Sequence, residues 1–67
     1  MNYKEFDMLP KDPVILLSYV NTQLRDNYSS LDALSEGLDL SKEDLNEVIE
    51  TLKKAGYEYL ASQNKFV

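Results

Sequence analysis

The chain has 67 residues, of which 43% are apolar, so it is long enough for one small folded domain and for no more than one. Twelve acidic residues against seven basic ones give a net charge of −5 at pH 7, which disfavours nucleic acids and anionic membrane surfaces as partners. The absence of cysteine and histidine excludes disulfides, thiolate metal sites and the commonest catalytic base and nucleophile.

The apolar pattern predicts neither a membrane span nor a secretion signal. The longest unbroken apolar run, residues 14–17, is far shorter than the ~20 residues that a transmembrane helix needs. The segment that leads into it contains Glu5, Asp7 and Asp12 and two prolines, and therefore lacks the basic start of a signal peptide. We expect a cytoplasmic location.

Residues 1–11 are predicted to form an extended arm. They carry scattered apolar side chains without a helical or strand period, and Pro10 disfavours a helical conformation at Leu9. The pair Asp12-Pro13 is typical of a helix start, because aspartate accepts hydrogen bonds from free amides and proline has no amide hydrogen to leave unpaired. A first helix is therefore predicted over residues 12–27.

Apolar residues occur on two sides of this predicted first helix. Ile15 and Tyr19 are four residues apart, so they are adjacent on the helix surface, and the helical wheel places them away from the core side. We expect them to be covered either by the arm, through Phe6 and Leu9, or by a partner chain, and they are the candidate interface residues. The core side carries five apolar residues at helical spacing, namely Leu16, Leu17, Val20, Leu24 and Tyr28.

A short second helix is predicted over residues 30–36. Ser29 and Ser30 are both suitable N-caps, and Asp32 completes a capping arrangement with Ser29. Gly37 is expected to end the helix in the left-handed conformation. Because few residues separate this helix from the next, the two are expected to pack at a steep angle, as in a helix-turn-helix.

A third helix is predicted over residues 42–55, and a hairpin over residues 57–67. Ser41 is the expected N-cap, and Gly56 followed by Tyr57 is typical of a Schellman ending. After it, alternating tyrosines, a polar turn and a short apolar end indicate two strands. The predicted fold is therefore mainly α (α+β), a single winged-helix-like domain over residues 1–67 with three helices and a C-terminal β-hairpin.

Two short segments are more distinctive than the helix pattern: Leu-Pro-Lys-Asp-Pro at residues 9–13 and Asn-Thr-Gln-Leu-Arg-Asp at residues 21–26. With the closing segments 56–59 and 64–67, they resemble a family of very short bacterial proteins, domain of unknown function forty-two fifty. The resemblance covers most of the chain from Leu9 onward. It implies a bacterial, cytoplasmic protein, and it transfers no activity and no site residue.

The spacing of residues 29–45, followed by Gly56, is more distantly similar to that of winged helix-turn-helix transcription regulators. In such a protein the third helix would enter the DNA major groove with basic or amide side chains facing outward. Asn46 could reach adenine there, and the turn residues 63–65 could contact the minor groove. However, glutamate repels the phosphate backbone, and the outward side of the predicted helix carries Glu43, Glu47, Glu50 and Lys54.

These observations favour a protein–protein interaction module, acting as a homodimer or with another protein, over an enzyme. The serines fit caps and turns without a neighbouring base, and no acidic segment has the spacing of a calcium loop. We expect no catalytic residue, no cofactor, no metal, no small-molecule substrate, no nucleic acid and no membrane partner. The alternative function is a DNA-binding winged-helix transcription regulator. Arg25 is expected either to join the first two helices, by reaching Asp32 or a backbone carbonyl, or to contact a partner.

Overall fold

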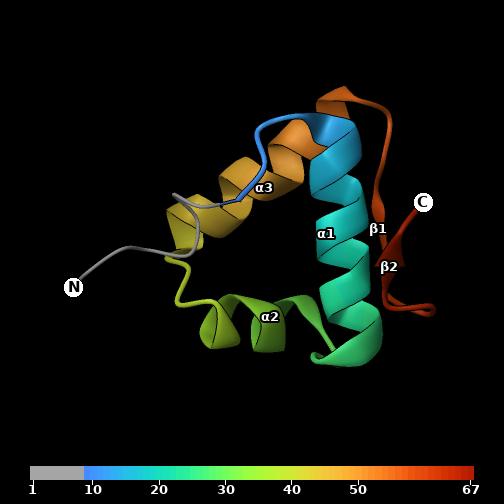
Figure 1. The fold of residues 1–67 in the computed structure, drawn as a ribbon. Coiled ribbons are helices and arrows are strands. Elements are labelled where there is room, and N and C mark those ends of the chain that lie inside the picture. The colour runs from blue at the N-terminus through green and yellow to red at the C-terminus, as the bar shows by residue number, and fades with distance from the viewer. Residues whose placement is uncertain (1–8) are drawn as a thin grey trace.

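In the computed structural model, the described part of the chain, residues 9–67, forms three helices followed by a two-stranded hairpin (Figure 1). The predicted mainly α fold with a C-terminal hairpin is therefore confirmed, and its likeness to winged helices stays a prediction. Residues 1–8 of the predicted arm lie outside the described part. The elements are α1 (Pro13–Asp26), α2 (Leu31–Gly37), α3 (Lys42–Lys54), β1 (Tyr59–Leu60) and β2 (Lys65–Phe66).

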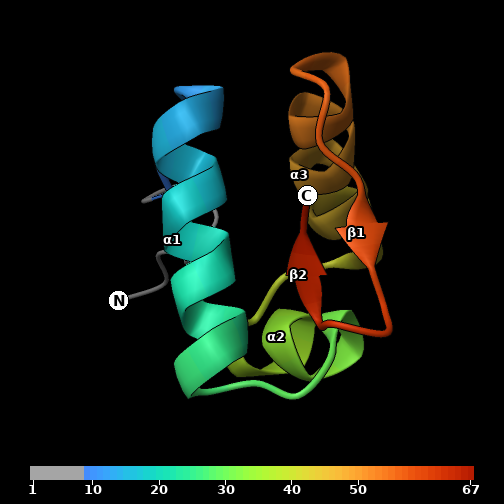
Figure 2. The ribbon, with the colours of Figure 1, turned by 90° about the vertical axis from the view of Figure 1, so that its right-hand side faces the viewer.

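The central element is α1, which packs against both other helices and against β2. Figures 1 and 2 show α1 running alongside the hairpin, with α2 lying across one end of it. Leu16, Val20 and Leu24 form its buried stripe, because a spacing of four keeps side chains on one side of a helix. The other buried residues come from the arm, α2, the α2–α3 loop, α3 and β2, and they are Leu9, Leu34, Leu38, Val48, Leu52 and Phe66.

Side-chain caps begin all three described helices. Asp12 accepts a hydrogen bond from the Val14 amide at 3.2 Å, and Ser41 accepts one from the Asp44 amide at 3.0 Å, as predicted. At α2 the cap is Ser30, whose hydroxyl accepts from the Ala33 amide at 3.1 Å. The predicted pairing of Ser29 with Asp32 is therefore not the capping arrangement, because the helix starts one residue later.

The C-terminal end of α3 has the predicted Schellman geometry. The amide of Tyr57 donates to the Leu52 carbonyl at 2.9 Å, and the amide of Gly56 donates to the Lys53 carbonyl, also at 2.9 Å. Gly56 has a φ of 97°, which only glycine adopts without strain. The sharp reversal that follows returns the chain toward α1 as the hairpin.

The end of α2 differs from the prediction. The left-handed residue is Asp39, with a φ of 58°, and Gly37 is still helical. A Cβ atom at Gly37 would overlap the ring of Tyr28, so glycine permits the close approach of that ring to α2. The prediction of a left-handed Gly37 was wrong because this requirement comes from tertiary packing rather than from the helix end.

The hairpin is antiparallel, with Tyr59 opposite Phe66. These two rings pack on the core side with centroids 5.5 Å apart and planes tilted by 57°. One step out, Glu58 and Val67 exchange both backbone hydrogen bonds, at 3.0 and 2.8 Å. In an antiparallel ladder such pairs alternate with pairs whose amides and carbonyls point outward. The backbone groups of Phe66 therefore point away from β1 and toward α1.

Candidate functional site

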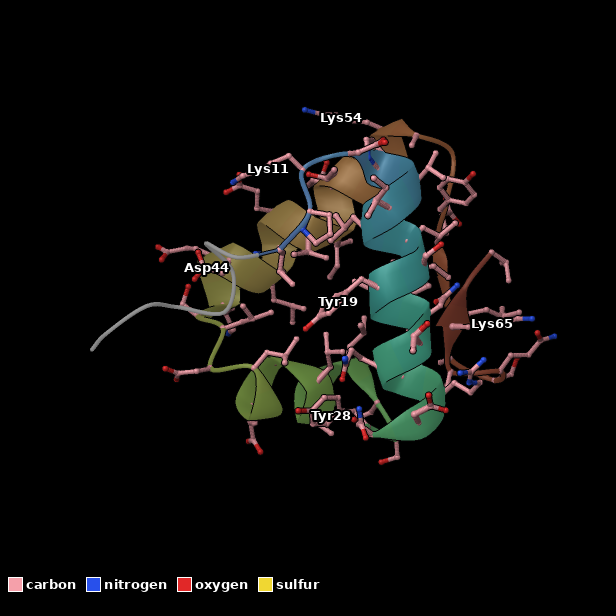
Figure 3. All side chains as sticks on the ribbon, in the orientation of Figure 1. Lys11, Tyr19, Tyr28, Asp44, Lys54 and Lys65 are labelled. Atoms are coloured by element: carbon pink, nitrogen blue, oxygen red, sulfur yellow. The ribbon has the colours of Figure 1, made fainter. Side chains whose placement is uncertain are left out.

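The predicted interface pair, Ile15 and Tyr19, is only partly outside the core. Ile15, in the first turn of α1, is 55% exposed. Tyr19 is half-buried and packs against the core, and Figure 3 shows it directed from α1 toward the region between α2 and α3. Its placement away from the core was wrong, because Tyr19 is only about 60° around the helix from Leu16 at 100° per residue. Its role in an interface stays a prediction.

The described end of the arm does fold back onto the domain. Leu9 is buried in the core at 7% exposure, as the folded-back arm predicts. Beside it, Pro10 and Lys11 face the α3 residues Glu47 and Thr51 across a small hollow. Phe6, the other residue expected to cover the pair, lies outside the described residues. Within residues 9–67, the packing therefore leaves Ile15 as an exposed apolar side chain.

The outward side of α3 is acidic. Glu43, Glu47 and Glu50 are all exposed, whereas Val48 and Leu52 point into the core. The basic residues of this helix, Lys53 and Lys54, lie in its last turn, where they complement the partial negative charge of the helix end. The wheel predicted this distribution correctly, because α3 has a simple period with a single buried side.

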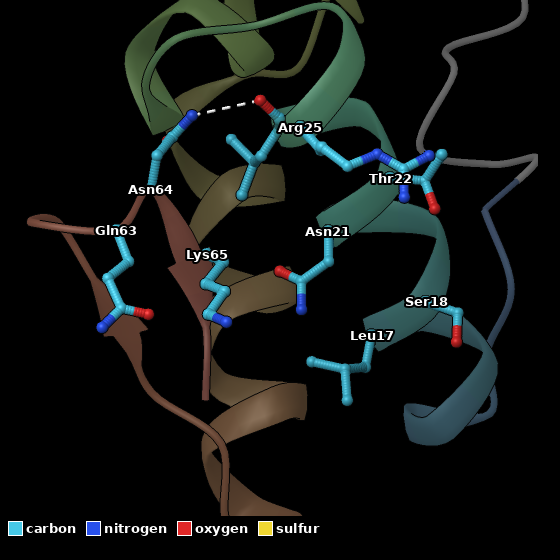
Figure 4. A pocket seen from close by; sticks show the side chains of 9 residues that line it. Leu17, Ser18, Asn21, Thr22, Arg25, Gln63, Asn64 and Lys65 are labelled. Atoms are coloured by element: carbon cyan, nitrogen blue, oxygen red, sulfur yellow. Dashed lines mark hydrogen bonds between the residues drawn. The ribbon is translucent and has the colours of Figure 1, made fainter.

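A groove that the sequence did not indicate lies between α1 and the hairpin (Figure 4). It is open to solvent and has a volume of about 670 Å³. Leu17 and Leu24 supply apolar surface, and the remainder of the lining is polar or basic. In Figure 4, Arg25 and Thr22 extend from α1, while Gln63 and Lys65 extend from the hairpin. The full lining is Leu17, Ser18, Asn21, Thr22, Leu24, Arg25, Gln63, Asn64 and Lys65.

Asn21 joins α1 to β2 through both ends of its amide group. Its Oδ1 accepts from the Phe66 amide at 2.8 Å, and its Nδ2 donates to the Phe66 carbonyl at 3.1 Å. The side chain thus pairs with the outward backbone groups of Phe66 as a third strand would. Buried backbone groups need such partners, so this contact fixes the hairpin against α1.

Asn64 makes the corresponding connection at the hairpin turn. Its Nδ2 donates to the carbonyls of Leu24 and Tyr28 at 3.1 and 3.0 Å, and the first of these bonds is the dashed line in Figure 4. Its Oδ1 accepts from the Tyr59 hydroxyl at 2.6 Å. Asn64 has a φ of 53°, a left-handed conformation that asparagine tolerates better than most residues. The turn is therefore held to the end of α1, and Asn64 is occupied by internal bonds.

Arg25 does not make the predicted contact with Asp32. Its Nε and Nη2 donate to the two carboxylate oxygens of Asp26 at 2.8 and 2.9 Å, so it binds its immediate neighbour. This hydrogen bond, together with the positive charge of Arg25, lowers the pKa of Asp26 below its ordinary value. The side chain of Arg25 is 73% exposed and lies at the edge of the groove.

Residues 9–67 contain no group of three or more acidic side chains placed to hold a metal ion. No helix in the same part of the chain is both long enough and apolar enough to cross a bilayer.

Residues 10–66 match the family model described as Domain of unknown function (DUF4250), and the chain belongs to that family. The resemblance of the Leu-Pro-Lys-Asp-Pro and Asn-Thr-Gln-Leu-Arg-Asp segments to this family is thereby confirmed. Searches among curated proteins and among solved structures gave no match.

Proposed function

We propose that this DUF4250 protein is a non-catalytic protein–protein interaction module, in which the side of α1 that carries Ile15 and Tyr19 meets a second protein or a second copy of the chain. The observation that carries the proposal is the exposure of Ile15, at 55%, in a regular helix whose residues Leu16, Val20 and Leu24 are buried in the core. Tyr19, one turn further along, supplies a half-buried aromatic side chain of the type enriched at interfaces.

Burial of this side would contribute measurably to association. Full burial of an isoleucine side chain is worth about 1.5–3 kcal/mol, so covering the exposed 55% of Ile15 would contribute roughly 0.8–1.6 kcal/mol. Val14, which is 60% exposed, lies beside Ile15 in the same turn and would add to the contact only if the partner extended around the helix. The first turn of α1 is therefore the centre of the proposed contact.

The alternative function, a DNA-binding winged-helix regulator, is supported by the order of three helices and a hairpin. Two features weigh against it. The exposed Glu43, Glu47 and Glu50 on α3 would face the phosphate backbone. The hairpin is also short, and its turn is tied to α1 through Asn64 rather than extended from the domain.

The test of the proposed function is Ile15→Glu compared with Val14→Glu. Both variants place the same charge in the same helical turn, on side chains that point about 100° apart. The full chain is cross-linked and measured by light scattering, alone and with proteins that co-purify with it. We expect Ile15→Glu to abolish the association and Val14→Glu to leave most of it, with the circular dichroism of both variants unchanged.

Two results would contradict the proposal. The first is a monomer without any bound protein, in which Ile15→Glu changes nothing except stability. The second is tight, salt-sensitive binding of the unmodified chain to duplex DNA in a gel assay, which would support the regulator instead.

A further inference from the structure

The groove between α1 and the hairpin differs in charge from the rest of this acidic protein. The chain has a net charge of −5, yet none of the nine groove residues is acidic, and two of them, Arg25 and Lys65, are basic. We propose that this groove binds a short acidic peptide segment, whose carboxylates pair with Arg25 and Lys65. The proposal goes beyond the interaction module described above, because it uses neither Ile15 nor Tyr19.

The two cations come from different elements that line the groove. Figure 4 shows Lys65 on the hairpin and Arg25 on α1, with the Arg25 side chain extending away from the hairpin. A guanidinium group has five N–H donors, and two bonds to Asp26 leave three for another carboxylate. Lys65 is exposed and forms no ion pair with any residue in the range 9–67. Lys65 can therefore pair with a carboxylate without breaking an internal contact. The charge of Arg25 is balanced by Asp26, and its remaining N–H groups can donate hydrogen bonds to the same ligand.

The rest of the groove suits a peptide backbone. Ser18, Thr22 and Gln63 offer hydroxyl and amide groups along its length, and Leu17 offers an apolar surface. Asn21 and Asn64 are committed to the hairpin and fix the distance between the two walls. Ser18 and Arg25 are seven positions apart on a helix, or about 10 Å along its axis. An extended peptide covers that length with about three residues.

Charge and shape favour a peptide over other anions. A nucleic acid carries many phosphates that would extend past the two cations and approach the glutamates of α3. A small metabolite usually needs an enclosing pocket, whereas this groove is open along one side. At physiological ionic strength, the interaction between exposed charges more than about 8 Å apart is largely screened. A short peptide with one or two carboxylates in the groove therefore interacts mainly with the groove residues and only weakly with the acidic side chains elsewhere on the protein.

The test is a titration of the isotope-labelled full chain, followed by NMR amide shifts, with the capped tetrapeptide Leu-Glu-Asp-Leu and its uncharged counterpart Leu-Gln-Asn-Leu. We expect the acidic peptide to cause saturable shifts that centre on the groove residues, and the uncharged peptide to cause few. Arg25→Gln and Lys65→Gln should each weaken binding by roughly two- to fivefold, the range for exposed ion pairs. Lys53→Gln removes an exposed cation on α3 and is the matched control, with binding unchanged.

Several outcomes would overturn the proposal: no saturable shift at millimolar peptide, equal shifts with both peptides, or equal weakening by Lys53→Gln. Stronger shifts of the same amides with duplex DNA would assign the groove to nucleic acid instead. Because the three substituted side chains are exposed, unchanged circular dichroism is the check that each variant is folded. If Ile15→Glu abolishes association but the groove binds no peptide, only the inference about the groove is refuted. If the groove binds the acidic peptide but Ile15→Glu does not change association, only the proposed function is refuted.

Discussion

Replacement of Asn21 by alanine should destabilise the domain although the side chain lies on the polar side of α1. Asn21 makes two hydrogen bonds to the backbone of Phe66, and removal of a typical intramolecular hydrogen bond costs about 0.5–1.5 kcal/mol, so the pair contributes about 1–3 kcal/mol. Alanine recovers about 0.6 kcal/mol through its higher helix propensity. The expected net loss is therefore about 0.5–2.5 kcal/mol, a large share of the ~3–10 kcal/mol that a domain of this size has.

Urea unfolding followed by circular dichroism measures this loss. With a slope of about 1 kcal/mol/M, the midpoint should fall by about 0.5–2.5 M. The matched control is Asn46→Ala, since Asn46 is an exposed residue inside α3 whose side chain makes no hydrogen bond within the described part of the chain. It gains the same helix propensity and loses nothing, so its midpoint should stay the same or rise slightly.

A second substitution separates the two bonds. Asn21→Asp keeps the acceptor for the Phe66 amide but places an oxygen opposite the Phe66 carbonyl, so it should also be destabilising. If Asn21→Ala and Asn46→Ala unfold at the same urea concentration, the reasoning is refuted. That result would mean that solvent or another group satisfies the backbone of Phe66 equally well.

Three further predictions concern local features. Asp39→Gly should raise the midpoint of urea unfolding by an amount equivalent to about 0.5–1 kcal/mol, because Asp39 has a φ of 58° that glycine adopts without strain; no gain would contradict this. Gly37→Ala should destabilise the wild-type chain, because the Cβ atom of the alanine would overlap the ring of Tyr28. In a Tyr28→Ala chain the overlap is gone, so the same substitution should raise the free energy of unfolding by up to about 1 kcal/mol through its higher helix propensity. Destabilisation in both chains would contradict the overlap. NMR titration should place the pKa of Asp26 below its ordinary value and should return it to that value in Arg25→Gln. The resulting stabilisation is complete above the ordinary pKa of about 3.9 and is lost as the pH falls through the lowered pKa.

The starts of α1 and α3 and the end of α3 could be predicted because their determinants are local. Asp12 and Ser41 each cap an amide two or three residues away, and Gly56 closes the Schellman motif within one turn. A short stretch of sequence contains both partners of each such contact. The single buried side of α3 is similarly visible, because its apolar residues repeat with one clear period.

The groove and its supports could not be predicted, because they depend on residues far apart in the chain. Asn21 contacts Phe66 across 45 positions, and Asn64 contacts Leu24 across 40. In sequence, Asn21 is an ordinary polar residue on the side of a helix that would face water if no hairpin packed there. Asn64 reads only as a turn residue. The error at Tyr19 has a different origin, because Tyr19 lies only about 60° around the helix from Leu16 and the helical wheel could have placed it beside the core.

The two proposed contacts use different parts of α1 and are therefore compatible. Ile15 lies in the first turn, whereas Arg25 is ten positions further on, or about 15 Å along the helix axis. Lys65 is on the hairpin side, and Figure 3 shows it on the opposite side of α1 from Tyr19. A three-residue acidic segment bound between Arg25 and Lys65 would leave Ile15 uncovered. A module of this size could thus hold a peptide of one partner while its first helix contacts another protein or a second copy.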